Sequence, residues 1–184
     1  MARIRVGIIG LSASDVAWVS RSHGMALQKA PLSTKYQLTA IATTSAESAA
    51  ASATRWGIPP EKAYTKAEDI AADPDVDLVV VGVKLPLHYD LTLPALKAGK
   101  DVFVEWPLAT DMNQVKELQA AAKRGGGRVI VGLQARASPF ILKVGRAFSI
   151  AKRGAFLKVM MSLIKKRLRK SLTPVHSERL PQQL

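Results

Sequence analysis

The sequence predicts an α/β fold built on a doubly wound parallel sheet, and two observations support this prediction. Strand-like and helix-like segments alternate through the first 150 of the 184 residues, and strands joined by helices pair in parallel through right-handed crossovers. Residues 77–83 (DLVVVGV) include three consecutive valines, a run typical of a strand that helices bury on both faces. We therefore expect one domain over residues 3–150 and a basic tail over residues 151–184.

The first half of the domain opens on a short apolar strand. Residues 4–10 (IRVGIIG) end in a glycine, as a buried strand does before a turn. Residues 14–29 are expected to form a helix that ends before Pro31. The elements that follow in this half are a strand (38–42), an alanine-rich helix (46–56), a loop (57–60), a short strand (63–64) and a small helix (67–71).

The second half repeats the pattern around the valine-rich strand. A helix over residues 87–98 is expected to end at Gly99, because glycine is favoured just after a helix C-terminus. Thr110 or Asp111 can cap the next helix, since a side-chain oxygen there accepts a backbone N–H. The elements that follow are a strand over residues 101–105, the helix that stops at the glycines 125–127, a strand over residues 128–133 and a helix that begins at Pro139.

The positive charge of the chain is concentrated at its C-terminal end. Residues 145–184 hold ten basic side chains and one acidic one, whereas residues 1–144 hold 17 and 13. An electrostatic argument for a partner therefore applies to the tail alone. Nucleic acid is not expected as a partner, because only Phe148 and Phe156 offer the tail an aromatic ring for stacking.

Several classes of site are excluded by composition. The chain contains no cysteine, which excludes disulfides, thiolate metal sites and a cysteine nucleophile. His23 and His176 have no companion at ligand spacing, so we expect no metal. A strand-like N-terminus argues against a signal peptide, and no segment approaches the roughly 20 apolar residues that span a bilayer. A cytoplasmic location, with the nucleus as an alternative, is the expectation.

Ligands of doubly wound sheets bind outside the carboxyl ends of the strands, and the first such end holds an altered glycine motif. Gly10 occupies the first glycine position of a dinucleotide fingerprint, but Ser12 and Asp15 replace the other two. Small residues at positions 12–14 allow a pyrophosphate to approach backbone N–H groups, whereas the charge of Asp15 opposes one. A plain strand–helix turn is an equal alternative.

The end of the second strand does not select a cofactor. NAD-specific folds usually carry an acid here for the ribose hydroxyls, and residues 43–45 (TTS) contain none. An arginine that would attract the phosphate of NADP is also missing there. NAD and NADP therefore remain equal expectations.

Three later strand ends complete a recognisable set. Residues 83–89 (VKLPLHY), 105–108 (EWPL) and 134–142 (QARASPFIL) follow strands in that order. Together with the altered glycine turn they resemble the N-terminal domain of the glucose–fructose oxidoreductase/inositol dehydrogenase (Gfo/Idh/MocA) family. Within it, the galactose-regulon repressor of yeasts and its fungal relatives are the closer likeness. The resemblance covers residues 3–150 and implies a Rossmann-type domain that binds NAD or NADP.

The resemblance implies a role for one or more residues at each strand end. For His88 and Glu105, a packing or ion-pair role is the alternative that the residues themselves leave open. Trp18 and Trp56 are expected to pack in the core or at its edge. The implied cofactor contacts are Gly10, Ser12 and Ala13 at the phosphates, Thr43 at the adenosine ribose, Val83, Leu85 and His88 along the cleft, and Glu105, Trp106 and Gln134 near the nicotinamide.

Trp106 bears on whether the chain is an enzyme. Active dehydrogenases of the family carry Glu-Lys-Pro where this chain reads Glu105-Trp106-Pro107, and an indole N–H does not titrate. We expect a nucleotide-binding, oxidoreductase-like protein without a complete catalytic site, with a regulatory sensor as one form of it. The alternatives are an active NAD(P)-dependent sugar or polyol oxidoreductase and a binding module whose tail contacts a membrane or a partner.

The tail leaves two interpretations open. Family members continue into a large, mostly antiparallel sheet domain, and the likeness stops before such a domain. The apolar and basic residues at 156–168 suit an amphipathic helix for an anionic membrane or an acidic partner. A shortened gene product with an unselected end is the favoured interpretation. Without the second domain no oligomer is expected, a protein partner is possible, and apolar surface is expected to be left uncovered.

Overall fold

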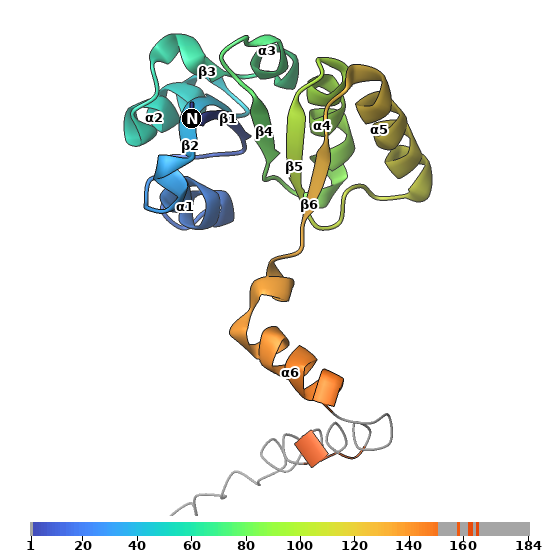
Figure 1. Cartoon of the computed structure of the whole chain (residues 1–184). Coiled ribbons are helices and arrows are strands. Elements are labelled where there is room, and N and C mark those ends of the chain that lie inside the picture. Colours follow the sequence, from blue (N-terminus) through green and yellow to red (C-terminus); the bar gives the residue numbers. More distant parts are fainter. Residues whose placement is uncertain (1, 151–157, 159–161, 164, 166–184) are drawn as a thin grey trace, which may run out of the picture. The chain divides into compact units, whose positions relative to one another are not determined.

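The computed structural model describes residues 2–150, 158, 162, 163 and 165. The chain divides into two compact units, Met1–Leu133 and Gln134–Leu184. The sheet belongs to the first unit, and the second contributes η5 (Gln134–Ala137) and α6 (Pro139–Ile150) (Figure 1). The amphipathic helix suggested for the tail lies largely outside the described residues. The expected domain limit at residue 150 stays a prediction.

The first unit is built on a six-stranded sheet in the order β3-β2-β1-β4-β5-β6. Every pair of neighbouring strands is parallel, which confirms the predicted doubly wound α/β fold. The chain fills the sheet in one direction from β1 and in the other from β4, so the switch in direction lies between these two strands. The strands are β1 (Ile4–Ile9), β2 (Tyr36–Ala42), β3 (Ala63–Tyr64), β4 (Leu78–Val81), β5 (Asp101–Glu105) and β6 (Val129–Gly132).

Helices cover both faces of the sheet, and the valine run of β4 is divided between two apolar cores. Val79 and Val81 pack with α3, α4 and α5 on one face, whereas Val80 packs with α2 and the segment after β1 on the other. This arrangement is the reason that the run does not alternate with polar residues. The helices are α1 (Met25–Leu27), α2 (Ala46–Trp56), α3 (Ala67–Ala72), α4 (His88–Lys97) and α5 (Met112–Gly125), with short turns η2 (Leu32–Thr34), η3 (Pro60–Lys62) and η4 (Leu85–Leu87).

Local sequence signals fix the ends of α2 and α5. The Ser45 side chain accepts the N–H of Ser48 at the start of α2. Asp111, one of the two predicted caps, accepts two backbone N–H groups at the start of α5. Both helices end at a glycine of left-handed conformation, Gly57 (φ 67°) and Gly126 (φ 81°), where a side chain would be strained.

The segment after β1 departs from the expected helix over residues 14–29. Helical conformation begins only at Trp18, and the middle of the segment is a π-helix, η1 (Ser20–Gly24). Gly24 lies against the ring of Trp56, so close that a Cβ on the glycine would come within 2.6 Å of it. Packing on α2 thus overrides the local helical pattern. Trp56 is buried as expected, whereas Trp18 is 59% exposed.

A buried carboxylate ties α3 to the strand before it. The Asp73 side chain accepts hydrogen bonds from Lys62 Nζ (2.8 Å), the Tyr64 hydroxyl (3.0 Å) and the N–H of Asp75 (2.8 Å). Burial acts to raise the pKa of Asp73, but these hydrogen bonds outweigh burial and lower it. The carboxylate is therefore held in its charged form.

Candidate functional site

A cavity of about 720 Å³ opens at the carboxyl ends of β1, β4 and β5, where the strand order reverses. Ligands of open α/β sheets bind at such a switch point. Three of the five strand ends that the sequence singled out, those of β1, β4 and β5, therefore meet at one rim. Residues from the sequence-based site that line this cavity are Gly10, Val83, Leu85, His88, Glu105 and Trp106.

Glycines let the ends of β1 and β4 approach each other closely. Gly10 has a φ of 92°, and a Cβ on it would lie 2.7 Å from the Gly82 carbonyl oxygen and 2.8 Å from a Val83 methyl group. A Cβ on Gly82 would lie 2.3 Å from Val19. Sequence reasoning identified Gly10 but missed Gly82, although its place after the valine run was the available signal.

The loop after Gly10 is anchored by its backbone. The Ser12 carbonyl accepts hydrogen bonds from the Trp56 indole N–H and the Ser20 hydroxyl, both at 2.9 Å. The N–H groups of Ser12 and Ala13 donate to no other described residue. Because helical conformation begins later than expected, these loop N–H groups replace a helix N-terminus as the donors available near the turn. Ser12 and Ala13 lie beside the cavity in sequence but are not among its lining residues.

The acid in the loop is paired. Asp15 accepts a hydrogen bond from Arg55 Nη2 at 2.8 Å. Both side chains are exposed, so the pair contributes little to stability. The arginine nevertheless offsets the negative charge that was expected to oppose a phosphate.

Thr43 lies at the end of β2, next to the turn of β1. Its N–H donates to the Tyr64 carbonyl (3.0 Å) and its hydroxyl to the Ser45 carbonyl (3.4 Å). The neighbouring strand ends are joined by the Gly10 N–H, which donates to the Ala42 carbonyl at 2.9 Å. Thr43 does not line the cavity, and its expected contact with a ribose stays a prediction.

His88 forms part of the cavity wall. The side chain is buried, with Nδ1 2.7 Å from the Pro107 carbonyl oxygen and Nε2 3.0 Å from the Val83 carbonyl oxygen. A neutral imidazole donates from only one of its ring nitrogens, yet both nitrogens here face acceptors. The ring therefore ties the loop after β4 to the loop after β5, which is the packing role that the sequence left open.

Glu105 is buried and held by residues from the segment after β1. Its Oε1 lies 2.5 Å from His23 Nε2 and accepts a 3.3 Å hydrogen bond from the Trp18 indole N–H. The His23 ring also packs edge-on against Phe103, with ring centroids 5.3 Å apart. Sequence reasoning missed His23 as a site residue, because its partner lies 82 positions away along the chain.

Two tryptophans are exposed at the cavity rim. Trp106 is 66% exposed and Trp18 is 59% exposed, and both line the cavity. Exposed indole faces at a cavity are suited to stacking on a planar ring. Gln134 belongs to η5 in the second unit, and its expected place near the nicotinamide stays a prediction.

The described part of the chain holds neither a cluster of metal-ligating side chains nor a membrane-spanning helix. No group of three or more histidine, aspartate or glutamate side chains among the described residues could hold a metal ion. No described helix is both long enough and apolar enough to cross a membrane.

A parallel sheet in this order, with a glycine turn after β1 and a cavity at the switch point, defines a Rossmann-type dinucleotide-binding domain. Residues 4–133 match the model of the Gfo/Idh/MocA oxidoreductase family, described as an NAD-binding Rossmann fold. The chain belongs to this family.

Curated relatives include both dehydrogenases and regulators. The dehydrogenase aclE of Aspergillus oryzae is 43% identical over 142 residues, which are 77% of this chain and 39% of the relative. The galactose/lactose metabolism regulatory protein GAL80 of Saccharomyces cerevisiae is 31% identical over 154 residues, 80% of this chain and 35% of the relative. The chain thus spans about two-fifths of the length of these relatives or less.

The solved structures that resemble this chain also include both a regulator and an enzyme. The transcriptional regulator Gal80p from Kluyveromyces lactis superimposes with a TM-score of 0.70 at 29% identity, over 80% of this chain and 37% of that one. The 3-ketoreductase KijD10 from Actinomadura kijaniata, in a complex with NADP, gives a TM-score of 0.67 at 31% identity, over 80% and 44%.

Proposed function

We propose that this chain binds NAD or NADP at the cavity between β1, β4 and β5 and lacks a complete catalytic site of its own. The observation that carries the proposal is the cavity itself, which gathers the Gly10 turn and the exposed Trp106 at one rim. A regulatory, nucleotide-sensing role fits this site better than turnover. A protein partner and a cytoplasmic or nuclear location go with this proposal.

The residues around the turn fit a dinucleotide. Gly10 leaves room at the crossing of two strand ends, where any Cβ would clash. The N–H groups of Ser12 and Ala13 are the donors for a pyrophosphate, and Thr43 is the candidate for the adenosine ribose. Val83 and Leu85 supply the apolar wall.

The proposed nicotinamide end offers a planar ring an exposed aromatic side chain. Trp106 is the candidate to stack on that ring, and Glu105, which lines the same cavity, and Gln134 are further expected contacts. A bound nicotinamide supplies hydride transfer in this family's chemistry. The protein groups positioned here bind and orient, because an indole exchanges no proton and Glu105 is held by His23.

One observation favours the alternative of an active NAD(P)-dependent sugar or polyol oxidoreductase. Lys84 lines the same cavity and is exposed, so an amine able to exchange a proton is present. Reduction of NAD or NADP by a polyol with this chain alone would support the alternative. Loss of that turnover in Lys84→Met would assign proton exchange to the Lys84 amine.

The test of the proposal is titration of the full chain with NAD and with NADP, by calorimetry and by tryptophan emission. The chain has three tryptophans, and we expect saturable binding with quenching that comes mainly from Trp106. Trp106→Phe should lose most of the quenching while calorimetry still detects binding. Absence of saturable binding to either nucleotide would refute the proposal, and unchanged quenching in Trp106→Phe would refute the placement of the ring.

A further inference from the structure

Strand β6 is the last strand of the sheet, and no described strand pairs with its outer edge. The Val102 N–H donates to the Arg128 carbonyl at 2.8 Å, so the backbone of Arg128 faces β5. The direction of the backbone groups alternates along a strand. The N–H and C=O groups of Val129 and Val131 therefore face outward, available to another strand.

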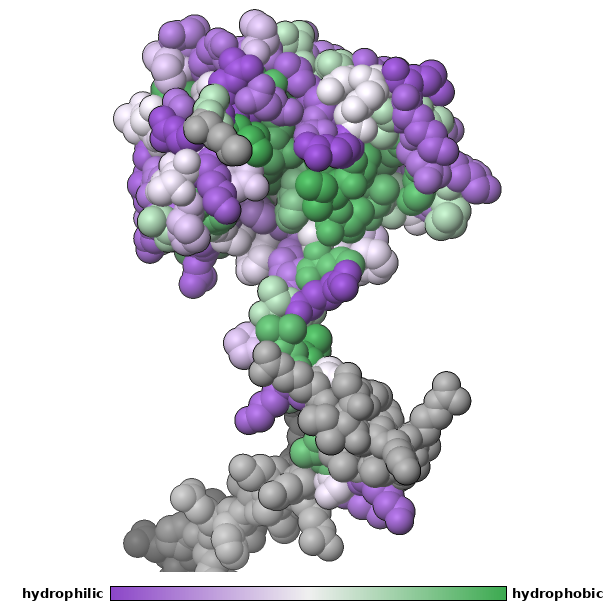
Figure 2. Space-filling view, in the orientation of Figure 1, coloured by the Kyte–Doolittle hydropathy of each residue, from purple (hydrophilic) through white to green (hydrophobic). Residues whose placement is uncertain are grey.

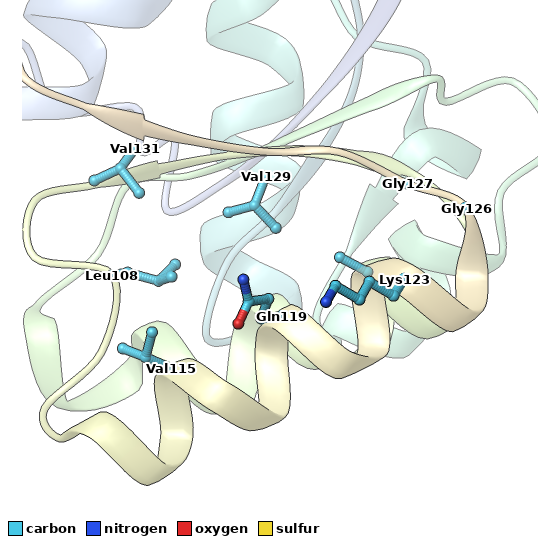
Figure 3. Close-up of a pocket in the computed structure, with 9 residues that line it drawn as sticks. Leu108, Val115, Gln119, Lys123, Gly126, Gly127, Val129 and Val131 are labelled. Carbon is cyan, nitrogen blue, oxygen red and sulfur yellow. The ribbon is translucent and has the colours of Figure 1, made fainter.

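Hollows lined largely by apolar residues lie on both sides of this edge, and Gln119 and Lys123 also line the one on the α5 side. On the α5 side, a cavity of about 520 Å³ lies between α5 and β6, and Figure 3 shows Val129 and Val131 pointing into it, with Leu108 and Val115 across from them. On the other face, Ile130 is 50% exposed and lines a second hollow of about 230 Å³ with Phe103. Apolar residues gather over this face of the strands in Figure 2.

Strand β6 is short, but it carries none of three other features that protect many natural edge strands from pairing. Such edges are usually interrupted by lysine, proline or a β-bulge. Residues 129–133 (VIVGL) are apolar or glycine, and β6 pairs with β5 in an unbroken register. We propose that β6 pairs with β6 of a second copy of this chain, antiparallel and about a two-fold axis at Ile130.

A second copy fits this edge because the edge is complementary to itself. With Ile130 opposite the same residue of the second copy, Val129 lies opposite Val131, and these two exchange backbone hydrogen bonds. The valines of both copies then form one apolar stripe over the two α5-side cavities. Both Ile130 side chains lie together on the other face.

Charge supports the same orientation. A two-fold axis at Ile130 places the two α5 helices antiparallel, so the basic C-terminal end of each lies beside the N-terminal end of the other. Lys123 and Arg124 stand in the last turn of α5, and Asp111 caps its start. The sequence alone led us to expect no oligomer without the family's second domain, and this interface does not use that domain.

A single introduced thiol tests the axis. The natural chain has no cysteine, and residues opposite each other in a non-hydrogen-bonded antiparallel pair have Cα atoms about 4.5 Å apart, within disulfide range. Ile130→Cys should form a disulfide-linked dimer on mild oxidation. Val16→Cys, at a position 83% exposed and away from the edge, is the control. Cross-linking of Ile130→Cys no greater than that of the control would overturn the proposal.

Sedimentation equilibrium of the full chain provides an independent measurement. Wild type should be dimeric, and Val131→Pro should be monomeric because it removes an outward N–H that makes no bond within the sheet. Val131→Thr keeps that N–H and a similar shape, and should stay dimeric. A monomeric wild type, or a Val131→Pro dimer as tight as wild type, would contradict the β6 interface.

Discussion

At the scale of single residues, the candidate site depends on the absence of a side chain at Gly10. Its φ of 92° and the 2.7 Å approach that a Cβ would make to the Gly82 carbonyl leave no room for a side chain. Strand ends from β1 and β4 meet here because both carry glycine.

Replacing Gly10 should weaken dinucleotide binding. In Gly10→Ala the new methyl group must push the Gly82–Val83 backbone away, so we expect at least a tenfold loss of affinity, about 1.4 kcal/mol. Gly57→Ala is the matched control, because Gly57 also has a positive φ but has no neighbour within 4 Å of its Cβ position. Calorimetric titration of both variants measures the difference, and equal affinities would argue against a ligand at this turn.

His88 and Glu105 show how far sequence reasoning reaches at this scale. Both were expected at the rim because parallel strands end on the same edge of a sheet, and both line the cavity. Their partners could not be foreseen. The Pro107 and Val83 carbonyls hold His88, and His23 holds Glu105, only because the fold brings distant segments together.

At the scale of elements, charged groups join the strands and helices at the end of the sheet opposite the cavity. Arg5 at the start of β1 pairs with Asp77 just before β4 at 2.7 Å, and its hydrogen bond lowers the pKa of Asp77. Asp73 ties α3 to β3 through Lys62 and Tyr64. A carboxylate whose folded pKa is lowered stabilises the protein above its unfolded pKa, and this contribution is lost as the pH falls through the folded pKa.

Asp73→Asn should therefore change both stability and its pH dependence. We expect the free energy of unfolding at pH 7 to fall by about 1–3 kcal/mol, because Lys62 and Tyr64 lose a charged acceptor. The loss of stability that wild type shows below about pH 4 should become shallower in the variant. Urea unfolding between pH 7 and 2 measures this, with the exposed Asp90→Asn as control. Parallel pH curves for Asp73→Asn and wild type would exclude the assignment.

At the scale of the whole molecule, the strand order determines where a ligand can lie. The chain connections run one way from β1 and the opposite way from β4, which leaves a crevice at the ends of these two strands. Helices cover both faces of the sheet. A ligand that spans this crevice contacts both halves of the sheet. It should stabilise the folded domain as a unit, since binding to the native state alone raises the free energy of unfolding.

Thermal unfolding should accordingly respond to NAD or NADP. At a nucleotide concentration of 100 times the Kd, the expected stabilisation is about 2.7 kcal/mol, which raises the Tm by several degrees. The Gly10→Ala variant should show a smaller rise at the same concentration. Calorimetric scans with AMP as a comparison separate whole-dinucleotide binding from binding of the adenosine half. A Tm that neither dinucleotide moves would contradict binding at the crevice.

Most of the helices and strands could be predicted from the sequence, because the signals that define them are local. The valine run of β4, the Asp111 cap and the glycines at 57 and 126 act over a few residues, and each lies where it was expected. The π-helix after β1, the His23–Glu105 contact and the place of β6 at the edge of the described sheet could be seen only in the folded structure. These features arise from packing between segments far apart in the chain, which no local pattern encodes.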